Sequence, residues 1–167
     1  MINTRRQRRW LNLAGVAVVV GLMTYALYAQ HVLGLEPCPL CIFQRIAMMA
    51  VGLVLLIAGL HAPAGKGARV YAVLGVLVAL TGAGISADHV RVQHLPQGQL
   101  ATCGPGLGYM LDAFPFGNVL KMVLSGSGEC HTINWTFLGL SMPGWVLIWF
   151  LILASLAFLT NWRSVRR

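Results

Sequence analysis

The chain has 167 residues, of which 57% are hydrophobic and only 10% are charged, with a mean hydropathy of +0.74. Ordinary soluble domains contain about 45–50% apolar and about 25% charged residues, so this composition excludes both a soluble domain and a disordered chain. The 19 glycines and 7 prolines follow no triplet period, which excludes collagen. The composition therefore indicates a membrane protein.

A formal net charge of +8 is also typical of nucleic-acid-binding proteins, but the positions of the charges favour a membrane. Nine of the twelve basic residues flank apolar segments: four lie before residue 11, two within 61–69 and three after residue 160. Basic clusters beside apolar spans orient a protein in a bilayer and require no polyanionic partner. We therefore expect no nucleic-acid partner.

Four stretches are long and apolar enough to cross a bilayer, which takes about 20 residues as a helix. They are residues 11–29, 42–60, 70–87 and 143–160, and the second of them contains the one charge, Arg45. The first stretch follows a basic segment, as a secretory signal does, but its apolar core is too long and no Ala-x-Ala site follows. We predict an all-α, polytopic four-helix bundle that forms a single membrane domain over residues 1–167.

An even number of spans places both termini on one side of the membrane. The basic segments before the first span, between the second and third spans and after the fourth span contain no acidic residue, so we predict that they are cytoplasmic. The acidic residues all fall on the other side: Glu36, Asp88, Asp112 and Glu129. The positions of the basic residues and those of the acidic residues thus support the same topology.

Two outer segments follow from this topology, about residues 30–41 and 88–142. Within the longer one, apolar residues repeat at helical spacing over 116–124, which predicts a short helix that lies in the membrane interface or packs as an ordinary loop helix. Trp135 and Trp145 fall near the outer interface, where amphipathic rings are enriched.

All four cysteines lie in the outer segments, on the side of the membrane where disulfides can persist: Cys38, Cys41, Cys103 and Cys130. Cys38 and Cys41 form a C-x-x-C pair directly before the second span. The free N–H groups and the dipole at a helix start favour a thiolate at Cys41, and Arg45 follows one turn later on the same helical face. This arrangement indicates disulfide chemistry.

Three other readings compete with this one. Four cysteines can bind zinc, but Cys103 and Cys130 are 27 positions apart, whereas structural zinc ligands usually come in two close pairs. Either cysteine pair can be a purely structural disulfide, although C-x-x-C rings tend to be labile. Arg45 can simply extend to the lipid headgroups, but a charge inside an apolar span is costly and usually functional.

Two stretches of the chain resemble the DsbB family, the disulfide bond formation protein B of bacterial inner membranes. Gln30-His31 and the run PCPLCIFQR at 37–45 resemble the first outer loop and second span of that family. A later part of the chain is similar to the second loop of that family and to its entry to the fourth span. The matching residues are the triplet Ala101-Thr102-Cys103, Cys130, Trp135 and the run FLGLSMP at 137–143.

The resemblance implies a multi-pass inner-membrane oxidoreductase with cytoplasmic termini that reoxidises a periplasmic DsbA-like protein and reduces ubiquinone or menaquinone. Cys103 would then form the mixed disulfide with the partner, and Cys130 would exchange with Cys38. Cys41 would face the quinone, with Arg45 beside it. The segment around Cys103 is less aromatic than the family pattern, so a dedicated DsbA-like partner is an alternative to the general one.

Histidines are less informative, because interfacial solvation is the default for each of them. His89 has one further option, which is to polarise an oxygen of a bound quinone. Two rival functions stay open at the level of the sequence. One is a quinone reductase like vitamin K epoxide reductase, and the other is a non-catalytic membrane scaffold with two structural disulfides.

Overall fold

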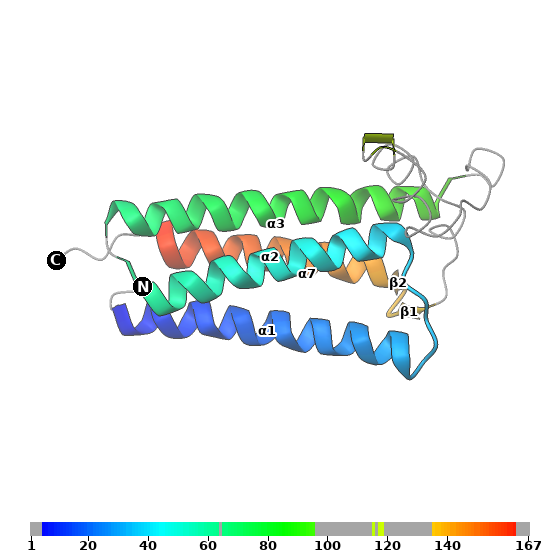
Figure 1. Ribbon diagram of the computed structural model, residues 1–167, viewed down its shortest axis with the longest axis horizontal. Helices are drawn as coiled ribbons and strands as arrows, with labels where there is room; N and C mark the ends of the chain where they lie inside the picture. Colours follow the sequence, from blue (N-terminus) through cyan, green and yellow to red (C-terminus); the bar gives the residue numbers. More distant parts are fainter. Residues whose placement is uncertain (1–4, 64, 96–114, 116, 119–134, 163–167) are drawn as a thin grey trace.

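The computed structural model describes residues 5–63, 65–95, 115, 117–118 and 135–162. Within them the chain forms four long helices and one two-stranded antiparallel hairpin (Figure 1). The elements are α1 (Arg5–His31), α2 (Pro39–His61), α3 (Lys66–Gln93), β1 (Thr136–Phe137), β2 (Leu140–Ser141) and α7 (Met142–Trp162). All four helices are long and apolar enough to cross a membrane, which confirms the predicted all-α, four-helix membrane fold.

The helices extend beyond the apolar stretches in the sequence. Helix α1 begins at Arg5 and helix α3 continues to Gln93, in each case through polar residues. Backbone hydrogen bonding continues through such residues, whereas the apolar stretch ends where the hydrocarbon layer does. The helix expected over residues 116–124 lies outside the described residues, apart from 117 and 118.

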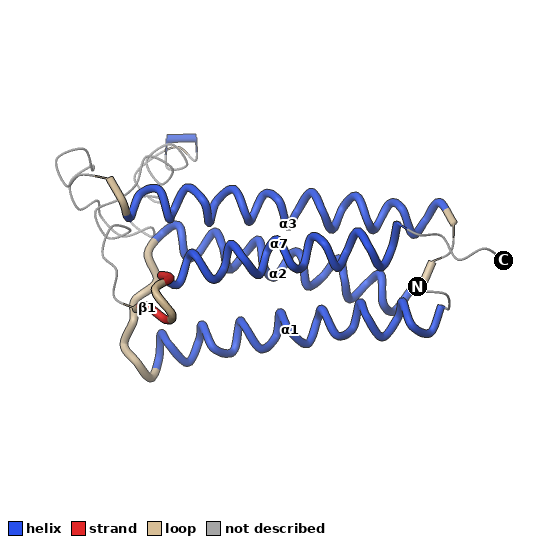
Figure 2. The backbone as a smooth tube through the Cα atoms, turned by 180° about the vertical axis from the view of Figure 1, so that it is seen from behind, coloured by secondary structure: helices blue, strands red, loops and turns tan. Residues whose placement is uncertain are grey.

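Helix α2 packs against both α1 and α3, α3 packs against α7, and α1 lies along one side of the bundle (Figures 1 and 2). The most extensive contact joins α3 to α7, while α1 packs mainly on α2. The start of α1 and the end of α7 lie at one end of the bundle, and the hairpin lies at the other end (Figure 1). We call these the inner and the outer end, after the predicted topology.

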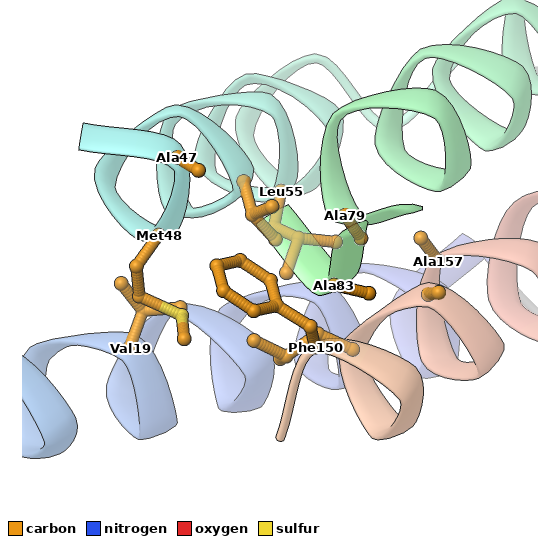
Figure 3. Close-up of a cluster of buried hydrophobic side chains, with 11 residues drawn as sticks. Val19, Ala47, Met48, Leu55, Ala79, Ala83, Phe150 and Ala157 are labelled. Atoms are coloured by element: carbon orange, nitrogen blue, oxygen red, sulfur yellow. The ribbon is translucent and has the colours of Figure 1, made fainter. Parts of the chain in front are cut away.

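The core of the bundle is built from a few large side chains set against small ones (Figure 3). Phe150 of α7 is completely buried and points into the space between the helices, near Ala79 and Ala83 of α3. Small residues allow helix backbones to approach closely, which is the usual packing device within membranes. The hydrophobic pattern alone predicts the spans but not these pairings.

Gly82 of α3 lies closest to the side chain of another helix among the described glycines of this bundle. A Cβ at Gly82 would overlap the buried ring of Phe150, whereas a Cβ at Gly84 would meet nothing within 4 Å. We expect Gly82→Ala to destabilise the bundle by about 1–3 kcal/mol, as overpacking does. Gly84→Ala is the matched control and should be neutral or slightly stabilising. Thermal unfolding in detergent measures both, and equal melting temperatures for the two variants would contradict this packing.

A polar cluster joins α1 to α7 at the inner end. The side-chain amides of Asn12 and Asn161 exchange hydrogen bonds, with Asn161 Nδ2 donating to Asn12 Oδ1 at 3.0 Å and Asn12 Nδ2 donating to Asn161 Oδ1 at 3.2 Å. Arg8 is only 2% exposed, and its Nη2 lies 3.5 Å from Asn161 Oδ1. The sequence analysis did not predict this cluster, because it joins residues 149 positions apart.

Candidate functional site

The C-x-x-C pair forms the start of α2. Cys38 is the N-cap residue, with extended backbone, and its sulfur accepts a hydrogen bond from the Cys41 N–H at 3.4 Å. Pro39 follows at the first helical position, where a missing N–H costs nothing. Cys41 therefore lies in the first turn of the helix, and the two Sγ atoms are 3.0 Å apart. Such a pair can form a disulfide and reopen it with little movement of the backbone.

His89 of α3 lies against this pair. Its side chain is only 3% exposed, and its Nε2 is 3.7 Å from Cys38 Sγ. Its Nδ1 is 3.0 Å from Nε2 of the buried Gln44, which lies one turn after Cys41 on α2. When the Gln44 amide donates to Nδ1, the ring proton is on Nε2 and is directed at the Cys38 sulfur. The structure thus buries His89, where the sequence analysis expected solvation at the interface.

Arg45 reaches from α2 to α1. Its Nη1 donates a hydrogen bond to Gln30 Oε1, and its Nη2 donates to the carbonyl oxygen of Ala26 at 3.2 Å. The guanidinium is therefore held by protein groups rather than extended to the lipid headgroups. Among the described residues the Arg45 side chain makes its hydrogen bonds to α1 and none to the Cys41 sulfur, although both residues line the same cavity.

A partly open cavity of about 140 Å³ lies at the outer end of the bundle. An engineered cavity of about 150 Å³ accommodates one benzene molecule, so this space is of aromatic-ring size. Its charged and polar lining residues, with the two cysteines, are Glu36, Cys38, Cys41, Gln44, Arg45, His89 and Gln93. The apolar lining comes largely from α1, α2 and α7, and includes Leu22, Met23, Met48, Met142 and Val146.

The residue before the hairpin contributes to the cavity wall, and the hairpin is tied to the helices beside it. Trp135, directly before β1, lines the cavity, and its ring packs against Tyr25 of α1 and stacks on Phe137. Trp145 Nε1 donates to the Phe137 carbonyl oxygen at 3.0 Å, which ties the hairpin to α7. The sequence analysis placed the tryptophans at the interface but did not predict the cavity contact.

Sequence reasoning named four of the residues that line this cavity, Cys38, Cys41, Arg45 and His89, and missed Gln44. The signal for Gln44 is weak, since it consists only of a polar residue one turn after Cys41 within an apolar helix. The other predicted pair, Cys103 and Cys130, lies outside the described residues. Its position relative to Cys38 and Cys41 stays a prediction.

Comparison with known proteins decides the family. The family model described as "Disulfide bond formation protein DsbB" matches residues 8–160. The chain belongs to the DsbB family. It is therefore a multi-pass membrane protein of disulfide bond formation, which implies a thiol–disulfide oxidoreductase. The same match favours DsbB over the alternative of a protein like vitamin K epoxide reductase.

Curated relatives support this membership over most of the chain. The DsbB-family protein named "Disulfide bond formation protein B" from Methylococcus capsulatus is 53% identical over 154 residues, which cover 92% of this chain and 94% of that one. A protein of the same name from Acinetobacter baumannii is 55% identical over 139 residues, covering 83% and 81%. Another from Azoarcus sp. is 47% identical and covers 94% of both chains.

Proposed function

We propose that this DsbB-family protein reoxidises a soluble periplasmic dithiol protein of the DsbA type and delivers the electrons to a membrane quinone. One observation carries the proposal: both cysteines of the C-x-x-C pair line a ring-sized cavity at the outer end of the bundle, at the start of a helix long and apolar enough to cross a membrane. A redox pair in this position can exchange with a protein outside the membrane and with a small apolar oxidant inside it.

The cavity suits a quinone ring. It offers apolar walls for the ring and cationic or N–H donors for its oxygens, from Arg45 on α2 and His89 on α3. Either ubiquinone or menaquinone fits this description. The chemistry that such a group supplies when bound is the uptake of two electrons and two protons. The protein's own contribution is to position the ring, to exclude water and to present the reactive sulfur.

The proposed relay consists of thiol–disulfide exchanges. The partner's thiolate attacks the Cys103–Cys130 disulfide at Cys103, and a mixed disulfide forms as Cys130 leaves. The second partner thiolate releases Cys103, so the partner leaves oxidised and the pair is reduced. Cys130 then attacks Cys38 of the Cys38–Cys41 disulfide, and Cys103 resolves the new bond. Two electrons thus reach Cys38 and Cys41.

The reduced pair must give up two protons along with its electrons before it can form a disulfide again. His89 supports this step when the Gln44 amide presents its oxygen to Nδ1, because Nε2 is then unprotonated, lies 3.7 Å from Cys38 Sγ and can accept a thiol proton. Gln44 fixes the ring orientation from the other side. Cys41 lies in the first turn of α2, where the helix start favours its thiolate.

Reconstitution tests the proposal directly. Purified protein with quinone and a reduced DsbA-type protein is expected to catalyse partner oxidation coupled to quinone reduction, in equal amounts. A scaffold with structural disulfides would instead resist a mild thiol reductant and would not be reoxidised by added quinone. Dependence on one particular DsbA-like protein would identify a dedicated partner.

Orientation in the inner membrane, with both termini cytoplasmic, is part of the proposal and has its own test. Single-cysteine variants that retain only Cys103 or carry only Ala64→Cys place one thiol in each predicted compartment. In intact cells a membrane-impermeant thiol reagent should label Cys103 and not the cysteine at position 64, because the basic 61–69 linker favours the inner side. Labelling at position 64 alone would reverse the topology.

A further inference from the structure

Three atoms that can bind a soft or borderline metal ion lie close together at the start of α2. The sulfurs of Cys38 and Cys41 and a ring nitrogen of His89 all lie within 4.8 Å of one another. We propose that, in the dithiol state, these three residues form a binding site for a thiophilic divalent cation such as Zn²⁺ or Cd²⁺. The sequence analysis considered zinc only for four cysteines and did not combine the C-x-x-C pair with a histidine.

The spacing of the three atoms suits a single ion. A zinc ion bonds sulfur at about 2.3 Å and histidine nitrogen at about 2.0–2.1 Å in tetrahedral geometry, so its ligand atoms lie about 3.8 Å apart for two sulfurs and about 3.5 Å apart for sulfur and nitrogen. The Cys38 Sγ–His89 Nε2 distance of 3.7 Å is close to the second value, whereas the Sγ–Sγ distance of 3.0 Å must widen by about 0.8 Å to reach the first. Small side-chain rotations are therefore sufficient to accommodate the ion.

The supporting contacts also resemble those of a metal site. Metal-binding histidines usually hold the second ring nitrogen in a hydrogen bond, and here Nδ1 faces the Gln44 amide. Binding at Nε2 requires the ring proton on Nδ1, so Gln44 must present its oxygen there, which a half-turn of the amide group achieves without a change of shape. The fourth coordination position faces the cavity that both cysteines line.

The oxidation state of the pair controls this site. A Cys38–Cys41 disulfide uses both sulfurs and leaves His89 alone, so the ion binds only the dithiol form. Binding replaces up to two thiol protons by the ion and transfers no electrons. A bound cation then stabilises the reduced protein by mass action. The functional consequence rests on the proposed function. There the ion acts as a reversible inhibitor, because it withholds Cys38 and Cys41 from oxidation.

Cadmium binding tests the site without quinone or partner. The full chain with Cys103→Ser and Cys130→Ser keeps only the two proposed sulfur ligands, and it is reduced and titrated with Cd²⁺ in detergent without oxygen. We expect one ion per chain, a cadmium–thiolate absorption band, competition by Zn²⁺, and no binding after oxidation. Binding that is unchanged by oxidation, or absent in the reduced protein, would overturn the proposal.

Variants then test the role of His89. His89→Ala should weaken Cd²⁺ binding by at least about 10–100-fold, because the loss of even a hydrogen-bonding partner of a metal ligand has an effect of this size. His94→Ala is the matched control, since His94 directly follows α3, is exposed, and among the described residues its ring bonds the Val90 carbonyl oxygen. Cadmium NMR of the protein with His89 intact reports a nitrogen donor directly, so the test does not depend on folding of His89→Ala. A spectrum with sulfur and oxygen donors only would overturn the assignment.

Turnover measurements separate this inference from the proposed function. Zn²⁺ should inhibit partner oxidation in the wild-type protein, and a chelator should restore it. If Cd²⁺ binds as expected while the reconstituted protein shows no turnover, the metal site stands and the proposed function fails. If turnover proceeds but the reduced protein binds no cation, the proposed function stands and the metal site fails.

Discussion

Replacing Cys103 or Cys130 by serine is expected to abolish oxidation of a protein partner while leaving a small dithiol able to drive quinone reduction through Cys38 and Cys41. A serine hydroxyl can neither form a disulfide nor leave as a thiolate, so the exchange with the partner loses its acceptor. The C-x-x-C pair remains intact at the start of α2 and borders the cavity, where a small reductant can reach it. The predicted loss with the protein partner is several orders of magnitude.

Two parallel assays measure this effect, one with a reduced DsbA-type protein and one with a small dithiol, each following quinone absorption. Ser127→Ala, a change in the same outer segment, is the control and should leave both rates unchanged. If the small dithiol also fails with a folded, quinone-bound Cys103→Ser protein, the proposed order of the relay is wrong.

Arg45→Met is expected to raise the quinone KM by about tenfold or more, because hydrogen bonds to a charged group contribute about 1.5–3 kcal/mol each. The change removes the cation from the cavity wall and also removes the bonds from α2 to Gln30 and to the Ala26 carbonyl. Arg45→Lys keeps the charge but loses the planar fork, so its KM should lie between those of the wild type and Arg45→Met.

Two further variants show which part of Arg45 matters. Gln30→Leu removes one hydrogen-bond partner and keeps the cation, so it should raise KM less than Arg45→Met does. Arg91→Met removes an exposed arginine that pairs with Asp88 at 2.7 Å, and such surface pairs contribute little. It should leave KM unchanged. An unchanged KM in a folded Arg45→Met protein would reduce Arg45 to a structural anchor between α2 and α1.

The spans and the C-x-x-C site were predictable because both depend on short stretches of sequence. An apolar run of about 20 residues predicts a membrane helix by itself, and the position of Cys38 and Cys41 before such a run predicts a helix start. The bond between Gln44 and His89 was not predictable in this way, since it joins residues 45 positions apart on two helices. The hydrogen-bond partners of Arg45 on α1 could not be predicted either, because they also lie on a different helix.

The hairpin shows a different limit of sequence reasoning. Its two central residues, Leu138 and Gly139, have φ angles of 50° and 79°, as a tight two-residue hairpin requires. Glycine adopts this conformation freely, but leucine does so rarely, so the residues Leu-Gly are no turn signal. The turn is held instead by contacts outside it, such as the Trp145 bond to the Phe137 carbonyl and the Ser141 bond to Gln93 at 2.7 Å.

The polar cluster of Arg8, Asn12 and Asn161 has a consequence for how the bundle is assembled during synthesis. The ribosome makes α1 before α7, so the Asn12 amide enters the membrane region well before Asn161 exists. Its side-chain hydrogen bonds are completed only when α7 arrives in the correct register, since a shift by one helical turn separates the two amides by about 5.4 Å. The pair therefore selects the fully inserted chain over partly inserted or slipped forms.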